Sequence, residues 1–150
     1  MIKIICVGKI KEQYFKDAIN EYLKRISKYT KIEIIEVPDN SFDIKKTMRE
    51  EYNSIMHVFN KNDYNILLDI DGTMYDSVSL ANKMNNLLID NSNITFIIGG
   101  SFGVVDEFKE QCNLRLSFSK LTFPHQLFRI ILLEQIYRSF KINNHEEYHK

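Results

Sequence analysis

Five short apolar runs alternate with segments of helical periodicity along this chain, and this alternation restricts its fold more than any other feature. The apolar runs fall at residues 1–8, 32–37, 64–70, 94–98 and 114–118. Helices are predicted at residues 11–28, 44–59, 77–88 and 106–111, and a last helix at Pro124 and beyond. Such alternation is typical of a mostly parallel sheet with helices on both faces. We therefore predict an α/β fold and, at 150 residues, a single domain over residues 1–150.

The stretch from Leu116 to Phe140 joins a short polar loop to the last helix. Pro124 is predicted to open this helix, because its missing N–H loses no partner in a first turn, with Thr122 or Ser119 as the capping oxygen. Apolar side chains recur on most sides of the helix, at Leu127, Phe128, Ile130, Ile131, Leu132, Leu133, Ile136, Tyr137 and Phe140. A helix that is apolar all round must be buried all round. In so short a chain, we expect a second copy of the protein to supply part of the cover.

Charge is distributed unevenly, although the net charge is zero. Residues 1–31 hold eight Lys and Arg against three acids, and residues 120–150 hold five against three. Residues 32–119 hold seven against fourteen. If the two ends of the chain meet in space, they form a basic face suited to phosphates, although solvated helix faces would show the same charges.

The cysteine content and the short apolar runs predict the cellular location of the protein. Two cysteines, Cys6 and Cys112, make a disulfide framework implausible and fit a reducing cytoplasm, where we expect them to be core thiols. The apolar start at residues 4–7 is too short for a signal peptide, and no apolar run approaches the ~20 residues of a membrane span. We therefore expect a cytoplasmic protein without a membrane partner.

The segment LLDIDGTMYDS at residues 67–77 is similar to the nucleophile motif of haloacid-dehalogenase-type phosphatases. In that reading Asp69 attacks phosphorus and Asp71 handles the proton of the leaving group, beside a magnesium ion. The later strand at 94–98 ends in Gly99-Gly100-Ser101, without the acidic pair that would hold the metal. Asp106 and Glu107 are better explained as acids in the first turn of a helix. An ordinary strand end with an Asp-Gly turn is the simpler interpretation.

A second motif, H-E-x-x-H, occurs at residues 145–149. On a helix, His145 and His149 would share a face and bind zinc. Asn143-Asn144 argues against a helix there, and one residue remains for a third ligand. We expect no metal site, and a polar tail from Asn143 to Lys150 that is free to be disordered.

A third candidate site combines Gly99 and Gly100 with the loop before Pro124. The two glycines follow a strand at the edge where open α/β sheets bind ligands, and glycine lets a ligand approach the backbone closely. The pattern is not G-x-G-x-x-G, so it does not indicate a dinucleotide.

Across almost its whole length, the chain resembles the RlmH family, the ribosomal RNA large subunit methyltransferases H of the SPOUT class. The resemblance is carried by VGKIKEQYFKDAI at 7–19, KIEIIEVPD at 31–39, Leu68 to Gly72, FIIGGS-x-G at 96–103, LSFSKLTFPHQLFRIILLEQIYRSFKI at 116–142 and the final YHK. Residues 40–61 are the least similar, so their conformation stays open. The resemblance implies a SPOUT-type fold with a trefoil knot near the C-terminus, and a homodimer.

The resemblance also implies an activity, the transfer of a methyl group from S-adenosylmethionine to N3 of a pseudouridine. The acceptor lies in a stem-loop of 23S rRNA at the ribosomal subunit interface. By motif position, the contacts of S-adenosylmethionine fall at Leu68, Gly99, Phe118, Ser119, Lys120, Leu121, Thr122 and Phe123. Leu68 and Phe118 are then expected to sandwich the adenine, and no metal is required, since the sulfonium is already a strong electrophile.

We hypothesise that five residues act on the acceptor base: Glu134, Arg138, Tyr148, His149 and Lys150. Arg138 would stabilise the developing uridine anion and His149 would relay the N3 proton. Lys150 would contact RNA. The face formed by the two ends of the chain is only moderately basic, which favours an assembled ribosome over free rRNA as substrate. A plain i,i+4 helix pair is the alternative for Glu134 and Arg138. The general base and the subunit that supplies each tail stay open, as does a non-catalytic RNA-binding module as an alternative function.

Overall fold

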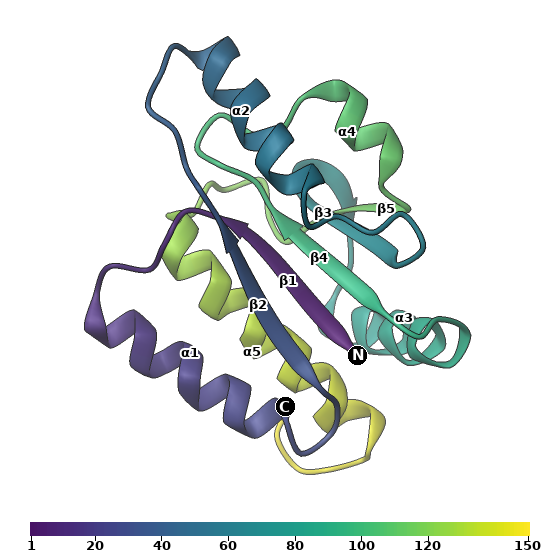
Figure 1. Cartoon of the computed structure of the whole chain (residues 1–150). Helices are drawn as coiled ribbons and strands as arrows, with labels where there is room; N and C mark the ends of the chain where they lie inside the picture. Colours follow the sequence, from purple (N-terminus) through teal and green to yellow (C-terminus); the bar gives the residue numbers. More distant parts are fainter.

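The computed structural model describes all 150 residues, and it shows one five-stranded sheet flanked by five helices (Figure 1). The elements in chain order are β1 Ile2–Val7, α1 Gln13–Ile26, β2 Ile32–Val37, α2 Ile44–Met56, β3 Tyr64–Met74, α3 Ser77–Asp90, β4 Ile94–Ile98, α4 Asp106–Gln111, β5 Leu114–Ser117 and α5 His125–Asn143. The strand order is β2-β1-β4-β3-β5, and every neighbouring pair is parallel. The predicted α/β class and parallel sheet are confirmed.

The two faces of the sheet carry separate cores, as the period-two alternation of a strand requires. Ile4 and Cys6 of β1 belong to the larger core, which α1, α3 and α5 cover. Ile5 and Val7 belong to the smaller core, which Ile55 of α2 and Phe108 of α4 cover. The continuous apolar runs therefore reflect burial on both faces, and the prediction of helices on both faces is confirmed.

The two basic ends of the chain do meet, because α1 packs beside α5 (Figure 1). The rings of Tyr22 and Tyr29 lie 6.3 and 6.4 Å from that of Tyr137. Tyr29 also stacks on Phe140 at 5.3 Å. This aromatic seam holds the two helices together on one face of the sheet.

The predicted Asp71-Gly72 turn is wrong, because β3 continues through it to Met74. Leu68 and Thr73 both lie opposite Leu116 of β5, so residues 69–72 form a bulge between them. At Gly72, a side chain would collide with the backbone of Arg115. Within this bulge, β5 approaches residue 72 too closely for anything larger than glycine.

The start of α5 also differs from the prediction. The helix begins at His125, Pro124 occupies the N-cap position, and no side chain caps it. The Ser119 hydroxyl instead accepts a hydrogen bond from the Leu121 N–H at 3.0 Å. It therefore stabilises the loop rather than the helix, and neither Ser119 nor Thr122 is the cap.

The C-terminal tail is held against the body of the protein, contrary to the expectation of disorder. Glu146 accepts hydrogen bonds from Lys141 at 2.5 Å and from the Tyr29 hydroxyl at 2.8 Å. His145 has a φ of +54°, so the chain reverses direction beyond α5 instead of extending it. The two histidines of H-E-x-x-H consequently do not share a helix face.

The structure also shows the conformation of residues 40–61 and the state of the two cysteines. Residues 40–61, left open above, contain α2, whose N-cap Asp43 accepts a hydrogen bond from the Lys46 N–H. Both cysteines are free, and burial raises the pKa of each thiol to about 12. None of the helices has the length and apolar character of a membrane span. The trefoil knot stays a prediction.

Candidate active site

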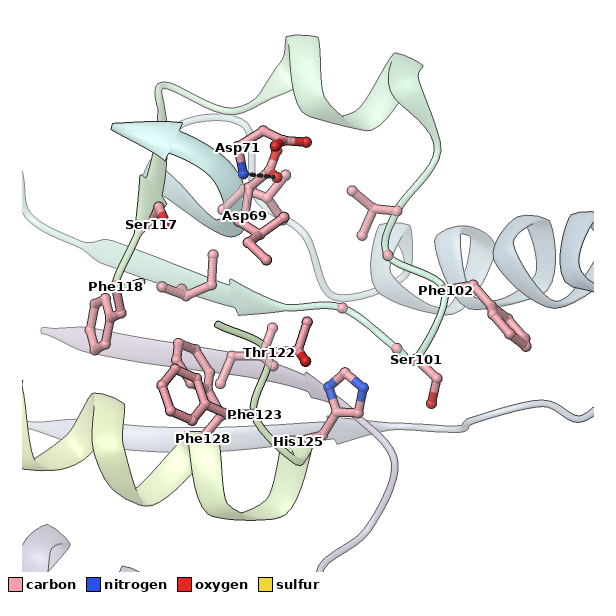
Figure 2. A pocket seen from close by; sticks show the side chains of 18 of the residues that line it. Asp69, Asp71, Ser101, Phe102, Ser117, Phe118, Thr122, Phe123, His125 and Phe128 are labelled. Carbon is pink, nitrogen blue, oxygen red and sulfur yellow. Dashed lines mark hydrogen bonds between the residues drawn. The ribbon is translucent and has the colours of Figure 1, made fainter. Parts of the chain in front are cut away.

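The carboxyl ends of β3, β4 and β5 surround a cavity of about 690 Å³ (Figure 2). Seven of the eight residues expected to contact S-adenosylmethionine line it, namely Leu68, Gly99, Phe118, Ser119, Leu121, Thr122 and Phe123. Lys120 is exposed and does not line the cavity. Segments that lie 50 residues apart in the sequence are thus brought to one site.

Gly99 ends β4 where the chain turns tightly around the cavity. A Cβ atom at this position would lie 2.8 Å from Cγ1 of Val104, which is too close for an unstrained contact. The turn is closed by a hydrogen bond of 3.0 Å from the Gly103 N–H to the Gly100 carbonyl. Gly103 has a φ of +79°, which glycine adopts without strain.

Three phenyl rings form one end of the cavity (Figure 2). Phe128, on the first turn of α5, meets Phe118 edge-on at 5.2 Å and stacks on Phe123 at 5.9 Å. The loop between β5 and α5 is shaped further by a hydrogen bond of 3.1 Å from the Ser117 hydroxyl to the Ser119 carbonyl. The cavity therefore has an apolar, aromatic wall at this end.

Asp69 of the phosphatase-like motif is already engaged by neighbouring groups. Its carboxylate lies 2.6 Å from Nη2 of Arg115 and accepts a hydrogen bond from the Asp71 N–H at 3.0 Å. Burial opposes ionisation of Asp69, but these two partners outweigh it and lower its pKa. No group of three His, Cys, Asp or Glu residues is placed to hold a metal ion. The geometry is that of a bound structural carboxylate, and it does not favour a phosphorus nucleophile.

The residues expected to act on the acceptor base gather along the second half of α5 and in the tail that follows it. Glu134 and Arg138 form an ion pair of 2.6 Å. The Tyr148 hydroxyl donates to Glu134 at 3.0 Å, and Nη1 of Arg138 lies 3.0 Å from Nδ1 of His149. The Arg138 guanidinium also lies 4.8 Å from the centre of the Tyr148 ring. We call Glu134, Arg138, Tyr148 and His149 the tail cluster; Lys150 is exposed beside it.

The tail cluster is more than a plain i,i+4 helix pair, since the tail folds back onto both charged side chains. The hydrogen bond with Glu134 raises the pKa of Arg138. Burial, followed by the hydrogen bond to Glu134, raises the pKa of Tyr148 to about 12. Arg138 is therefore a permanent cation, and Tyr148 keeps its proton at neutral pH.

Within one chain, the tail cluster and the cavity are separate. No member of the cluster lines the cavity, which α5 reaches only through His125 and Phe128. Counted from Phe128, Glu134 and Arg138 lie six and ten residues further along this helix. These spacings correspond to about 9 and 15 Å at 1.5 Å per residue.

The cavity has two lining residues on α5, and neither was predicted as a site residue from the sequence. His125 and Phe128 lie on the first turn of α5 and line the cavity. Burial, followed by the charge of Arg129, lowers the pKa of His125, so the imidazole is neutral at pH 7. Their position directly after the loop that carries most of the expected contacts is the signal that points to them.

The chain has clear relatives over its full length. Residues 1–149 match the family described as "Predicted SPOUT methyltransferase". A protein of Methanococcus maripaludis is 53% identical over 157 residues, with 99% of each chain covered. Proteins named ribosomal RNA large subunit methyltransferase H from Clostridioides difficile and Caldicellulosiruptor saccharolyticus are 48% and 46% identical, covering 99% and 100% of each chain.

A solved structure shows the same fold at low sequence identity. The crystal structure of tRNA (m1G37) methyltransferase from Aquifex aeolicus aligns with a TM-score of 0.52 and 13% identity, covering 91% of this chain and 69% of that one. The family match, the full-length relatives and this fold agree with one another. The chain therefore belongs to the SPOUT methyltransferases and, among them, to the family of ribosomal RNA large subunit methyltransferases H.

Proposed function

We propose that this protein is a cytoplasmic homodimer that methylates N3 of a pseudouridine in a 23S rRNA stem-loop at the ribosomal subunit interface, with S-adenosylmethionine as the methyl donor. The observation that carries the proposal is the convergence of seven expected donor contacts on one cavity, in a chain of this family. An assembled ribosome is the proposed substrate, because the protein's net charge of zero gives little electrostatic attraction to free RNA.

The cavity fits the proposed donor in size and chemistry. Leu68 and Phe118 supply apolar surface for a flat adenine ring. Val104 fills the space that a side chain at Gly99 would need, so only glycine keeps this turn beside the cavity unstrained. Asp71 and Asp106 line the cavity with one lysine, Lys109, whereas the charge of Asp69 is neutralised by Arg115. This small excess of negative charge suits a ligand whose sulfonium and ammonium groups outweigh its one carboxylate.

The separation of cavity and tail cluster supports a composite site in a dimer. Leu127, Ile131, Glu134 and Arg138 recur at helical spacing on α5, and none of them is fully buried in one chain. Two copies packed antiparallel along this stripe would cover it. They would also place the tail cluster of each subunit beside the start of the partner's α5, where the partner's cavity lies.

In this arrangement each residue has a defined task. Bound S-adenosylmethionine supplies an electrophilic methyl carbon. The cavity holds that carbon in line with N3 of the base. The Arg138 cation stabilises negative charge on the base as N3 loses its proton, and Glu134 keeps the guanidinium oriented. His149, whose Nδ1 accepts a hydrogen bond from Arg138 at 3.0 Å, would accept that proton on Nδ1, directly or through water, once this nitrogen turns from Arg138 to the base.

Two measurements on the purified protein test the proposal. Calorimetric titration with S-adenosylmethionine should show binding that a bulky substitution such as Gly99→Leu abolishes. Ribosomes that lack the modification should then gain N3-methylpseudouridine, detected by mass spectrometry of digested 23S rRNA.

Removal of Tyr148 to Lys150 provides the internal comparison. It should leave donor binding within about twofold, because these residues do not line the cavity of their own subunit, and it should abolish methylation. Ribosome binding without affinity for S-adenosylmethionine would instead indicate a non-catalytic RNA-binding module. Methylation at the wild-type rate without the tail would contradict the assigned role of the tail cluster.

A further inference from the structure

A second cavity, of about 370 Å³, adjoins the first at the carboxyl edge of the sheet. Gly100, Ser101, Phe102 and His125 line both cavities. Figure 2 shows the side chains of Ser101 and His125 close to one another, with the Phe102 ring pointing away from Phe123 and Phe128. A group in the second cavity would therefore lie directly beside a group in the first.

Two deeply buried side chains line this second cavity, and each has one polar atom without a hydrogen-bond partner. Glu51 of α2 is 4% exposed, and its Oε2 has no hydrogen-bond partner. Arg129 of α5 is 2% exposed, and its Nε is likewise unpaired. Unpaired buried polar groups are rare and cost on the order of 1–3 kcal/mol each. A carboxylate and a guanidinium from opposite faces of the sheet thus leave one acceptor and one donor for a ligand.

Other contacts hold both groups in position. Arg129 donates to the carbonyls of Val7 and Gly8 at 3.2 and 2.6 Å and to Glu36 at 2.7 Å. The Glu51 carboxylate occupies the space where a side chain at Gly100 would lie. Burial raises the pKa of Glu51, against an opposing hydrogen bond from the Asn40 backbone. The two unpaired atoms are thus fixed in place at the ends of the adjacent strands β1 and β4.

The rim of the second cavity combines exposed aromatic rings with lysines, beside one carboxylate, Asp39. Phe42 and Phe102 are 49% and 46% exposed, and the Lys46 ammonium lies 4.2 Å from the centre of the Phe42 ring. Lys9 and Lys11 are exposed on the loop after β1. Exposed aromatic rings stack on unpaired bases, and lysines bind phosphates. A zwitterionic amino acid would satisfy Glu51 and Arg129 but would leave the aromatic rim without a role.

We propose that the second cavity receives the acceptor base and that Glu51 selects pseudouridine over uridine by accepting a hydrogen bond from N1–H. This inference rests on the proposed function. Pseudouridine is attached to ribose through carbon, so it carries N–H groups on both sides of its C2 carbonyl. With N3 turned toward the first cavity, N1–H faces Glu51 and a neighbouring carbonyl of the base accepts from Nε of Arg129. Uridine has no N1–H, because N1 carries the ribose.

The physical basis of this selection is the cost of an unpaired buried group. A site built to bond an N–H rejects an analogue without it more strongly than a hydrophobic pocket rejects a missing methylene. Uridine would leave Oε2 of Glu51 buried and unpaired beneath the base. If an apolar side chain replaces Glu51, no buried acceptor is left unpaired when uridine binds. The variant should therefore bind uridine without this penalty.

The test compares wild-type protein, Glu51→Gln and Glu51→Met on ribosomes that carry either pseudouridine or uridine at the acceptor position. Single-turnover methylation and, with S-adenosylhomocysteine bound, ribosome affinity are measured for each pair. Glu51→Met should lower the preference for pseudouridine by about 10- to 100-fold. Glu51→Gln, which keeps a carbonyl acceptor, should retain part of that preference. Calorimetric affinity for S-adenosylmethionine should stay within about twofold of wild type in both variants.

Glu50→Gln is the matched control, because Glu50 precedes Glu51 on α2 and is exposed; its preference should equal that of wild type. If Glu51→Met kept the wild-type preference for pseudouridine while the wild-type enzyme is active, this inference would be overturned and the proposed function would stand. Loss of S-adenosylmethionine affinity with an unchanged preference would assign Glu51 to the donor's ammonium group and overturn it too. Failure of the wild-type enzyme to methylate either ribosome would overturn the proposed function and, with it, this inference.

Discussion

Asp63 shows how one buried carboxylate can join three strands of the sheet. Its side chain is 3% exposed and accepts hydrogen bonds from Lys3 at 3.0 Å, Thr95 at 2.8 Å and Asn93 at 3.2 Å. Lys3 belongs to β1 and Thr95 to β4, while Asp63 directly precedes β3. Burial opposes ionisation of Asp63, but these three partners outweigh it and lower its pKa. The carboxylate therefore stabilises the edge of the sheet opposite the cavities.

The lowered pKa of Asp63 predicts the direction of a pH dependence. A group whose pKa is lower in the folded chain stabilises the fold above its unfolded pKa of about 3.9, and this contribution is lost as the pH falls through the folded pKa. Asp63→Asn should lower the free energy of unfolding at pH 7 by about 2–3 kcal/mol and flatten its decline below about pH 5. Urea denaturation across this range measures both effects, with the exposed Asp90→Asn as control. Parallel curves for wild type and Asp63→Asn would contradict the prediction.

At the scale of elements, α5 combines two environments along one helix. Its first turn lines the cavity through His125 and Phe128, and its later turns carry Glu134 and Arg138. Leu132, Leu133 and Ile136 are buried against the sheet, while Leu127 remains 37% exposed. The apolar positions on all sides of α5 thus divide into a core face and a face that one subunit leaves uncovered.

Arg138→Gln separates a functional role of this helix from a structural one. Arg138 and Glu134 are 24% and 19% exposed, so their pair should contribute only about 0.5–1 kcal/mol to folding. Methyl transfer should nevertheless fall by about 100-fold or more, because the cation that we propose to stabilise the anionic base is lost. Thermal unfolding and single-turnover methylation measure the two effects.

The matched control is Arg25→Gln, which breaks the i,i+4 pair of Arg25 with Glu21 on α1. That pair has a distance of 2.9 Å and more exposed side chains. The control variant should keep the wild-type rate of methylation. Similar small losses of rate in both variants would show that Arg138 is an ordinary surface ion pair.

At the scale of the whole molecule, the proposed composite site makes a prediction that a homodimer of any one variant cannot test. Consider a mixed dimer of one subunit without Tyr148 to Lys150 and one subunit with Gly99→Leu. It should contain one complete site and keep about half of the wild-type rate, whereas each parent homodimer should be inactive. Two affinity tags allow its purification, and sedimentation confirms the dimer. An inactive mixed dimer would show that each tail serves the cavity of its own subunit.

Local sequence signals determined most of the secondary structure. Each predicted strand begins within one residue of an observed strand, because an apolar run is visible without knowledge of its neighbours. The loop at Phe118 to Phe123 and the Gly99 turn were predicted as site residues from the family resemblance, and all of them except Lys120 line one cavity. Lys120 shows the limit of such reasoning, since a motif position does not tell which way a side chain points.

Tertiary structure decided what depends on contacts between distant segments. Asp71-Gly72 has the composition of a turn, yet the approach of Arg115 on β5 draws it into a bulged strand. The tail has the composition of a disordered end, yet Tyr29 and Lys141 hold it in place. The second cavity depends on Glu51 and Arg129 reaching the same edge from opposite faces of the sheet. Periodicity reports only which face of an element is apolar; the partner of that face is set by how the chain crosses the sheet.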